Sequence, residues 1–332
     1  MMTAVLVCCA AVGTACSSSE PSDQLMVTDD PVAATAAKSP APSTAPAGTV
    51  SELAGTPTST VVDPEHGVLA VAVEQPPSVL LYDLPDSGSL TAPTEVPLPA
   101  PAESITLAAP GGPLLAAVPG ELVRIALPDG SVSAAPVDGE LTSAAAFGDR
   151  TLVAVRDRKA VAVLGGDTVH RMISGGLYSA DQVLATDKGA VVFDRLRNAV
   201  FELDVPKGTV DEGLRAGEGA TNAVTDRFGR VLVADTRGGA LLAFSLDPLL
   251  MRQRYPVEGA PYGLAYDRER DLVWVTLTGT NEVVGFDVAG EEPEEKHRFP
   301  TVEQPNSVAV DPNSGRVIVA SATGKGVQVI EV

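Results

Sequence analysis

Three short runs of basic residues recur in the middle of this chain, each between two apolar stretches. Their six cations are Arg156, Arg158, Lys159, Arg195, Arg197 and Arg237, and only three aspartates lie among them. This is unusual in a chain with 43 acidic and 23 basic residues. Guanidinium forks match carboxylate and phosphate groups, so the runs could contact an anionic group if the fold brings them together.

The elements that must carry these runs are visible as a repeat. One pattern with Asp at its sixth position recurs at residues 58–64, 221–227, 262–268 and 306–312, in units of about 40 residues. After each copy come a turn, two apolar runs rich in β-branched residues, such as 272–276 and 283–288, and a weaker third run. No helical period is present, so each unit predicts an antiparallel meander of four strands, a to d.

Counting these units predicts the architecture of residues 49–332. Seven units begin near Pro57, Pro101, Leu141, Leu177, Ala220, Pro261 and Pro305. Four-stranded sheets at this repeat length predict an all-β, seven-bladed β-propeller. The last unit stops after a third strand at residues 326–332, and a spare strand lies at residues 49–53. We expect the spare strand to complete the last blade and close the ring, which covers an open sheet edge.

The ring would gather the basic runs on one face. The d–a and b–c loops share a face that we call the top, and the a–b and c–d turns share the bottom. The runs are the b–c loops of the third to fifth units, so we expect a cationic arc on the top face. One interpretation is contact with a lipid head group, a phosphorylated glycan or an acidic protein. The alternative is that the cations pair with neighbouring aspartates.

The sixth unit reads VWVT at residues 273–276 and NEVVGFD at 281–287. This resembles the YVTN-type repeat of seven-bladed, NHL- and lactonase-like propellers, whose members include binding proteins, scaffolds and some lactone hydrolases. The resemblance implies a possible divalent-cation site at the mouth of the central channel, where oxygen ligands would suit calcium. In this chain the mouth positions include Glu103, Asn222, Tyr262 and Asn306, with Tyr178 or Gln182 in the fourth unit.

The N-terminal residues predict export and a lipid anchor. An apolar stretch too short to span a bilayer ends in Gly13-Thr14-Ala15-Cys16, and serines follow. This resembles a bacterial lipoprotein signal over residues 1–16, in which Cys16 would be acylated; the alternative is an ordinary secretory signal. Residues 17–48 are rich in Ser, Ala, Pro and Thr and predict a disordered tether. All three cysteines lie before residue 17, so the mature chain would have no disulfide.

Composition narrows the function further. The net charge of −20 argues against nucleic acid as a partner. We therefore expect a monomeric, actinobacterial type of lipoprotein outside the cytoplasm, anchored to the cell membrane, that binds a protein or an anionic envelope component through its top face. We identify no catalytic residues and expect no cofactor. The alternative is a metal-dependent, lactonase-like hydrolase that uses calcium at the channel mouth, and a purely structural scaffold is a third reading.

Overall fold

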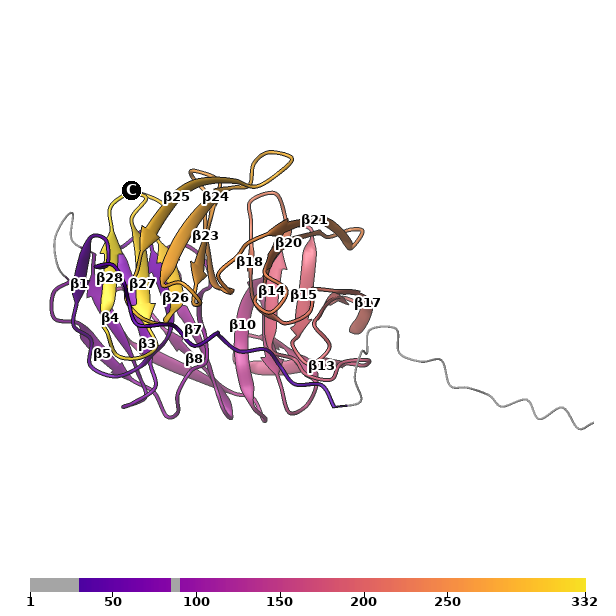
Figure 1. Ribbon diagram of the computed structural model, residues 1–332. Helices are drawn as coiled ribbons and strands as arrows, with labels where there is room; N and C mark the ends of the chain where they lie inside the picture. The colour runs from indigo at the N-terminus through magenta and orange to yellow at the C-terminus, as the bar shows by residue number, and fades with distance from the viewer. Residues whose placement is uncertain (1–29, 85–89) are drawn as a thin grey trace, which may run out of the picture.

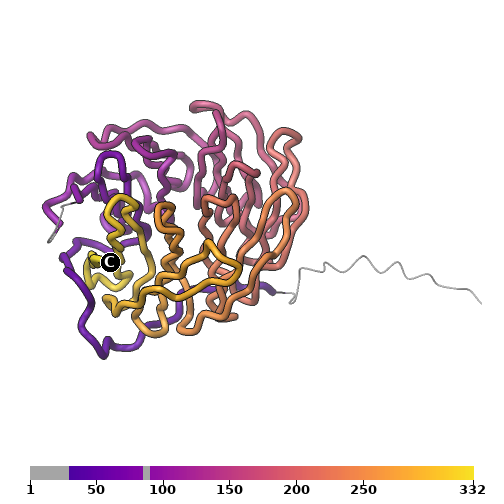
Figure 2. The backbone as a smooth tube through the Cα atoms, turned by 90° about the horizontal axis from the view of Figure 1, so that it is seen from above, coloured from indigo at the N-terminus to yellow at the C-terminus, as the bar shows by residue number. Residues whose placement is uncertain are grey.

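A computed structural model describes residues 30–84 and 90–332, and every regular element in these ranges is a β-strand. The strands form seven sheets, each of four antiparallel strands. In Figure 2 the chain passes once around a ring, and its yellow C-terminal part returns to the indigo beginning. The molecule is a seven-bladed β-propeller, as the repeat predicts. No helix in the described ranges is long and apolar enough to cross a membrane.

The strands are given blade by blade, from the channel outwards (Figure 1). Blade 1 holds β2 (Pro57–Asp63), β3 (Val68–Val73), β4 (Ser78–Asp83) and β5 (Thr94–Pro97). Blade 2 holds β6 (Ile105–Leu107), β7 (Leu114–Val118), β8 (Glu121–Ile125) and β9 (Val132–Pro136). Blade 3 holds β10 (Leu141–Phe147), β11 (Arg150–Val155), β12 (Ala160–Gly165) and β13 (Thr168–Ser174). Blade 4 holds β14 (Gln182–Thr186), β15 (Gly189–Asp194), β16 (Ala199–Asp204) and β17 (Thr209–Arg215).

The remaining blades continue the same pattern. Blade 5 holds β18 (Ala220–Thr225), β19 (Arg230–Asp235), β20 (Ala240–Ser245) and β21 (Leu250–Pro256). Blade 6 holds β22 (Pro261–Asp267), β23 (Leu272–Leu277), β24 (Glu282–Asp287) and β25 (Glu294–Pro300). Blade 7 holds β26 (Pro305–Val310), β27 (Val317–Ser321), β28 (Val327–Ile330) and, as its outer strand, β1 (Thr49–Ser51).

The hydrophobic core is divided among the spaces between blades. The b and c strands are mainly apolar, and in β3 all six residues are buried. Seven clusters of buried residues each combine side chains of two neighbouring blades. One of them packs Leu69 and Val71 of blade 1 against Ile318 and Val327 of blade 7. Each blade therefore buries its apolar faces only when both neighbours are present.

The predicted closure of the ring is confirmed. Strand β1 pairs antiparallel with β28, with Thr49 opposite Val329 and Ser51 opposite Val327. The last sheet thus receives its outer strand from the beginning of the described chain. The ring is closed both by apolar packing between blades 7 and 1 and by this strand pair.

Inner strands begin where predicted in five blades, at Pro57, Leu141, Ala220, Pro261 and Pro305. In blades 2 and 4 they begin later, at Ile105 and Gln182, because the preceding loops are longer. In blade 4 the carboxylate of Asp194 accepts hydrogen bonds from the Tyr178 backbone and the Ser179 hydroxyl at 2.6 and 2.9 Å. These bonds hold residues 178–181 as a loop, so the inner strand begins only at Gln182.

The tether prediction needs a correction over the residues that the structure describes. Residues 34–47, which we call the strap, are fixed to the top side of blades 5 to 7. The Ser39 hydroxyl donates to the Thr278 carbonyl at 2.6 Å, and the Gln304 amide donates to the Ala37 carbonyl at 2.9 Å. The Ala47 backbone donates to the Pro300 carbonyl at 3.0 Å. Of the predicted disordered segment 17–48, residues 17–29 lie outside the described ranges, as do the predicted signal 1–16 and Cys16.

Candidate functional site

Polar side chains on the inner strands tie each blade to the next. Thr58 donates to the Ala102 carbonyl at 2.7 Å, Thr106 to Ala144 at 2.7 Å and Gln182 to Ala223 at 2.8 Å. The backbone of Thr60 donates to the Ser307 hydroxyl at 2.9 Å, which joins blade 1 to blade 7. These bonds fix the inner strands around a central cavity of about 810 Å³.

The predicted mouth residues lie together on this cavity. Its lining includes Glu103, Asn222, Tyr262 and Asn306, and Gln182 fills the fourth unit's position. Tyr178, the other candidate there, instead packs under the guanidinium of Arg197, 5.0 Å from the ring centroid. The two asparagines among the mouth residues each form a hydrogen bond with a neighbouring group. Asn222 donates to the Tyr262 carbonyl at 3.1 Å, and Asn306 accepts from Gln304 at 2.9 Å.

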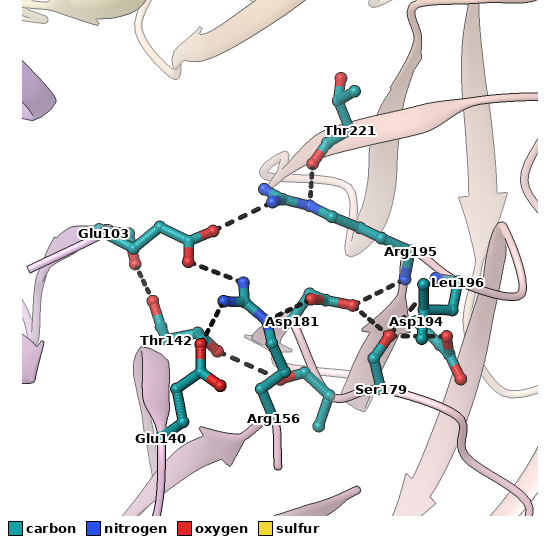
Figure 3. A network of polar contacts seen from close by, with 12 residues as sticks. Glu103, Glu140, Thr142, Arg156, Ser179, Asp181, Asp194, Arg195, Leu196 and Thr221 are labelled. Atoms are coloured by element: carbon teal, nitrogen blue, oxygen red, sulfur yellow. Dashed lines mark hydrogen bonds and ion pairs between the residues drawn. The ribbon is translucent and has the colours of Figure 1, made fainter. Parts of the chain in front are cut away.

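Glu103 forms the centre of an ion-pair network that crosses three blades (Figure 3). One of its carboxylate oxygens accepts from Arg156 at 2.7 Å, and the other accepts from Arg195 at 3.0 Å. Arg156 also donates to Glu140 and to Asp181, each at 2.8 Å. Burial disfavours the charged form of Arg156, but Glu103 and Asp181 outweigh it and hold the pKa of Arg156 above its usual range. We call these five residues the mouth network.

Arg195 extends the mouth network to blade 5 and to the backbone. Its guanidinium donates to the Thr221 carbonyl at 2.7 Å, and its backbone donates to Asp181 at 2.8 Å. Asp181 is nearly inaccessible, with 5% of its side chain exposed, so its charge depends on these donors. The arrangement is a pre-positioned polar platform beside the channel mouth.

The other predicted cations lie farther out on the same face. Arg158 is half exposed and pairs with Asp138, and Arg197 donates to the Gly176 carbonyl. Lys159 lies 5.7 Å from the centroid of the Tyr178 ring, and Arg237 donates to the Glu218 carbonyl at 3.3 Å. The structure therefore brings the six cations onto adjacent b–c loops.

Acids from the d–a loops are the part that sequence reasoning missed. The b–c loops carry Asp157, Asp194 and Asp235, and the d–a loops before blades 2 to 5 add five more acids: Glu103, Asp138, Glu140, Asp181 and Glu218. The arc is thus a mixed-charge surface, with most guanidiniums already paired. Both kinds of loop share the top face, so counting them together would have revealed these partners.

Aspartates at the ends of the b strands hold the top loops in place. Asp235, fully buried, accepts from the backbones of Glu218, Gly219 and Gly238 at 2.8–3.1 Å. In blade 3, Asp157 accepts from the Glu140 backbone at 2.7 Å. In blades 3 to 5, carboxylates that accept from backbone N–H groups thus link the b–c loop to the preceding d–a loop. The top loops are consequently rigid relative to the blades.

The aspartates of the repeat have a structural role at the bottom. Asp226 and Asp267 accept from backbone groups of their own turns, and both are buried. A histidine or arginine three to five residues later contacts each repeat aspartate, for example Arg230 with Asp226 at 2.6 Å. Within the described ranges, no three His, Cys, Asp or Glu side chains are arranged to hold a metal ion.

No family model and no curated protein matches this chain. Solved structures resemble it in fold. Hydrazine synthase of Kuenenia stuttgartiensis matches with a TM-score of 0.72 at 16% identity, over 86% of this chain and 98% of that chain. A streptogramin B lyase matches with a TM-score of 0.70 at 12% identity, over 85% and 96%. The WD40 propeller domain of Doa1 matches with a TM-score of 0.68 at 12% identity, over 86% and 95%. At these identities the similarity shows the β-propeller fold alone, which enzymes and WD40 domains share.

Proposed function

We propose that this chain is a binding module, held outside the cytoplasm by a lipid on Cys16, that docks a protein partner on the top face of blades 3 and 4. A YVTN-type propeller in an actinobacterial lipoprotein agrees with the repeat, the export-type N-terminus and the acidic composition. The proposal concerns a surface and a class of partner, and it assigns no catalytic step to the chain.

The mouth network is the observation that carries this proposal. It fixes loops of blades 2, 3 and 4 to one another and to the backbone of blade 5 before any partner arrives. A surface that is ordered in advance loses less side-chain and loop entropy on binding. Rigid loops around a channel mouth are therefore well suited to docking.

The pairing of charges favours a protein over a purely anionic ligand. Each of the three nitrogens of Arg156 donates to a different carboxylate, of Glu103, Glu140 or Asp181, so its charge is already compensated by acids of the protein. A mixed-charge surface instead complements a partner that also carries both signs. Arg158 and Lys159, which are exposed, are the cations that remain most accessible to such a partner.

The calcium-dependent hydrolase receives less support from this geometry. A cation bound by Glu103 would lie beside the guanidiniums of Arg156 and Arg195, and their repulsion opposes it. The amide oxygen of Asn306 already accepts a hydrogen bond from Gln304. We therefore place the function on the top loops.

Capture of the partner from detergent-solubilised membranes tests the proposal. The double variant Arg158→Gln, Lys159→Gln should weaken capture by roughly tenfold, because it removes two exposed charges from the docking surface. The matched control is Lys188→Gln, Lys207→Gln, which neutralises two exposed lysines in bottom turns of blade 4. Capture by the native chain should also fall at high salt.

Equal capture by the two double variants would place docking elsewhere on the molecule. Failure to recover any protein with the native chain after chemical cross-linking in intact cells would reject the binding module itself. Urea unfolding of both variants checks that the change lies in the surface rather than in the fold.

A further inference from the structure

A second hollow lies on the opposite, bottom face, between blades 3 and 4. It encloses about 460 Å³ and has no part in the mouth network. The turn between β10 and β11, the strands β12 and β13, and the turn between β16 and β17 form its walls. Its residues are Phe147, Gly148, Asp149, Arg150, Val163, His170, Arg171, Val205 and Pro206.

Two nitrogen-bearing side chains meet beside this hollow over Gly165. A Cβ atom on Gly165 would lie 2.4 Å from Nη1 of Arg150 and 2.5 Å from Nε2 of His170. The φ of Gly165 is outside the left-handed region, so the backbone does not require glycine there. The absent side chain instead provides the space in which Arg150 and His170 lie next to each other.

A β-bulge explains the position of His170, and a contact with blade 4 places the third side chain, Arg171. The register of β12 and β13 shifts from Val163 opposite Arg171 to Leu164 opposite Val169, which makes His170 the extra residue of a β-bulge. Bulges often redirect a side chain in this way. Arg171 reaches across to blade 4, where Nη1 donates to the Pro206 carbonyl at 2.9 Å. Its other guanidinium nitrogens make no hydrogen bond within the described ranges.

The positive charge of this group is poorly balanced. Asp149, with 86% of its side chain exposed, lies 3.4 Å from Nε of Arg150. The nearby turn acids are engaged elsewhere: Asp167 pairs with Arg124 at 2.8 Å, and Asp204 pairs with Lys207 at 2.6 Å. Among the residues that the structure describes, Asp149 is thus the one acid within ion-pair distance of the two arginines, in a chain whose net charge is −20. Such a cluster is electrostatically favourable only for an anion.

We propose that this hollow binds a phosphate group, using Arg150, His170 and Arg171 as donors. Arginine forks and an imidazole offer several N–H groups to the oxygens of one phosphate. Phe147, Val163 and Val205 form an apolar wall beside the donors, which suits the organic part of a phosphorylated small molecule. The site is independent of the top-face docking surface and adds a ligand to the molecule.

Titration of the folded protein with inorganic phosphate, followed by NMR of the histidine rings, tests the proposal. The chain has three histidines, so the reporter is readily assigned. Phosphate should shift the His170 resonances saturably and leave those of His66 and His297 unchanged. Phenyl phosphate should bind more tightly than phosphate because it also contacts the apolar wall. Arg150→Gln should weaken binding of both probes by roughly tenfold, the effect of losing one charge-assisted contact.

Gly165→Ala provides a variant that keeps every charge. The new methyl group would meet only the ends of two flexible side chains, so the fold should persist while Arg150 and His170 separate and binding weakens. The control is Arg252→Gln, at the corresponding bulge in β21 of blade 5, where binding should not change. Linear, unsaturable shifts, or equal affinity in native protein and Gly165→Ala, would overturn the proposal. Equal shifts at all three histidines would identify an adventitious ion only.

Discussion

At the scale of single residues, the most consequential side chain is Arg156. It compensates three carboxylates at once, and one of them, Asp181, has almost no access to water. An ion pair with a buried member contributes little when intact, but breaking it leaves a charge without compensation. The stability role of this arginine therefore depends on Asp181 rather than on the more exposed Glu103 and Glu140.

Replacing Arg156 by methionine should lower the free energy of unfolding by about 2 kcal/mol, a value reduced from the buried-pair range because Arg156 is partly exposed. Methionine keeps most of the apolar stem but removes the only charged donor to Asp181, which then keeps its bonds from the Arg195 backbone and the Ser179 hydroxyl. Urea unfolding monitored by tryptophan fluorescence of Trp274 measures the change.

Arg158→Met is the control for this prediction. Its side chain is 51% exposed and pairs with an exposed acid, so the substitution should change stability by no more than about 0.5 kcal/mol. If the two variants had equal free energies of unfolding, the ion pair between Arg156 and Asp181 would make no net contribution to stability.

Residue patterns predicted the cations and channel positions well, but not their partners. Arg195 and Glu103 are far apart in the sequence, and their contact depends on how the loops of blades 2 and 4 reach the mouth. The repeat alignment locates each loop but not the direction of each side chain. Asp181 was overlooked because it lies in the fourth unit, where the inner strand begins later than predicted.

At the scale of elements, two N-terminal segments hold the ring from different sides. Strand β1 adds a fourth strand to blade 7, whereas the strap lies across the top of blades 5 to 7. Figure 1 shows the strap as the indigo line that approaches β1. The strap is built mainly of small Ala and Pro residues and is held by hydrogen bonds to residues far away in the sequence. Composition alone could therefore not distinguish it from a disordered tether.

Two truncations separate the contributions of these segments. A chain beginning at Gly48 lacks the strap and should unfold at a temperature only a few degrees lower, because ring packing is intact. A chain beginning at Ala54 also lacks β1 and should self-associate, since the edge of β28 is then open to pair with another copy. Thermal unfolding and light scattering measure the two outcomes.

The chain beginning at Ala54 could instead remain monomeric and unfold at the same temperature as the chain beginning at Gly48. That result would show that β1 does not protect the edge of β28 from pairing with another copy. The chain beginning at Gly48 is the control, because it already lacks every strap contact and differs from the Ala54 chain only by residues 48–53.

At the scale of the whole molecule, the strap sets the reach of the proposed anchor. Followed from the N-terminus, the strap first contacts the top face at Ala34, whose side chain packs beside Gly219. Eighteen residue steps separate it from Cys16, which allows at most about 65 Å even when fully extended. A tether free up to residue 48 would allow nearly twice that distance. The proposed docking face would therefore stay close to the membrane surface.

Cys16→Ser should release the chain from the membrane fraction and abolish incorporation of labelled fatty acid. The control is Cys8→Ser, Cys9→Ser, which alters the two cysteines inside the predicted signal and should leave both properties unchanged. Fractionation and metabolic labelling in a bacterial host measure them. Membrane retention of the Cys16→Ser chain would show that the proposed lipid on Cys16 is not what holds it there.

The position of the strap also has a mechanical consequence. A force applied to the N-terminal residues first reaches the bonds of Ser39 and Gln304, and only then the short β1–β28 ladder. Under load the strap would thus detach first and lengthen the tether, before β1 is pulled away from β28 and the ring opens.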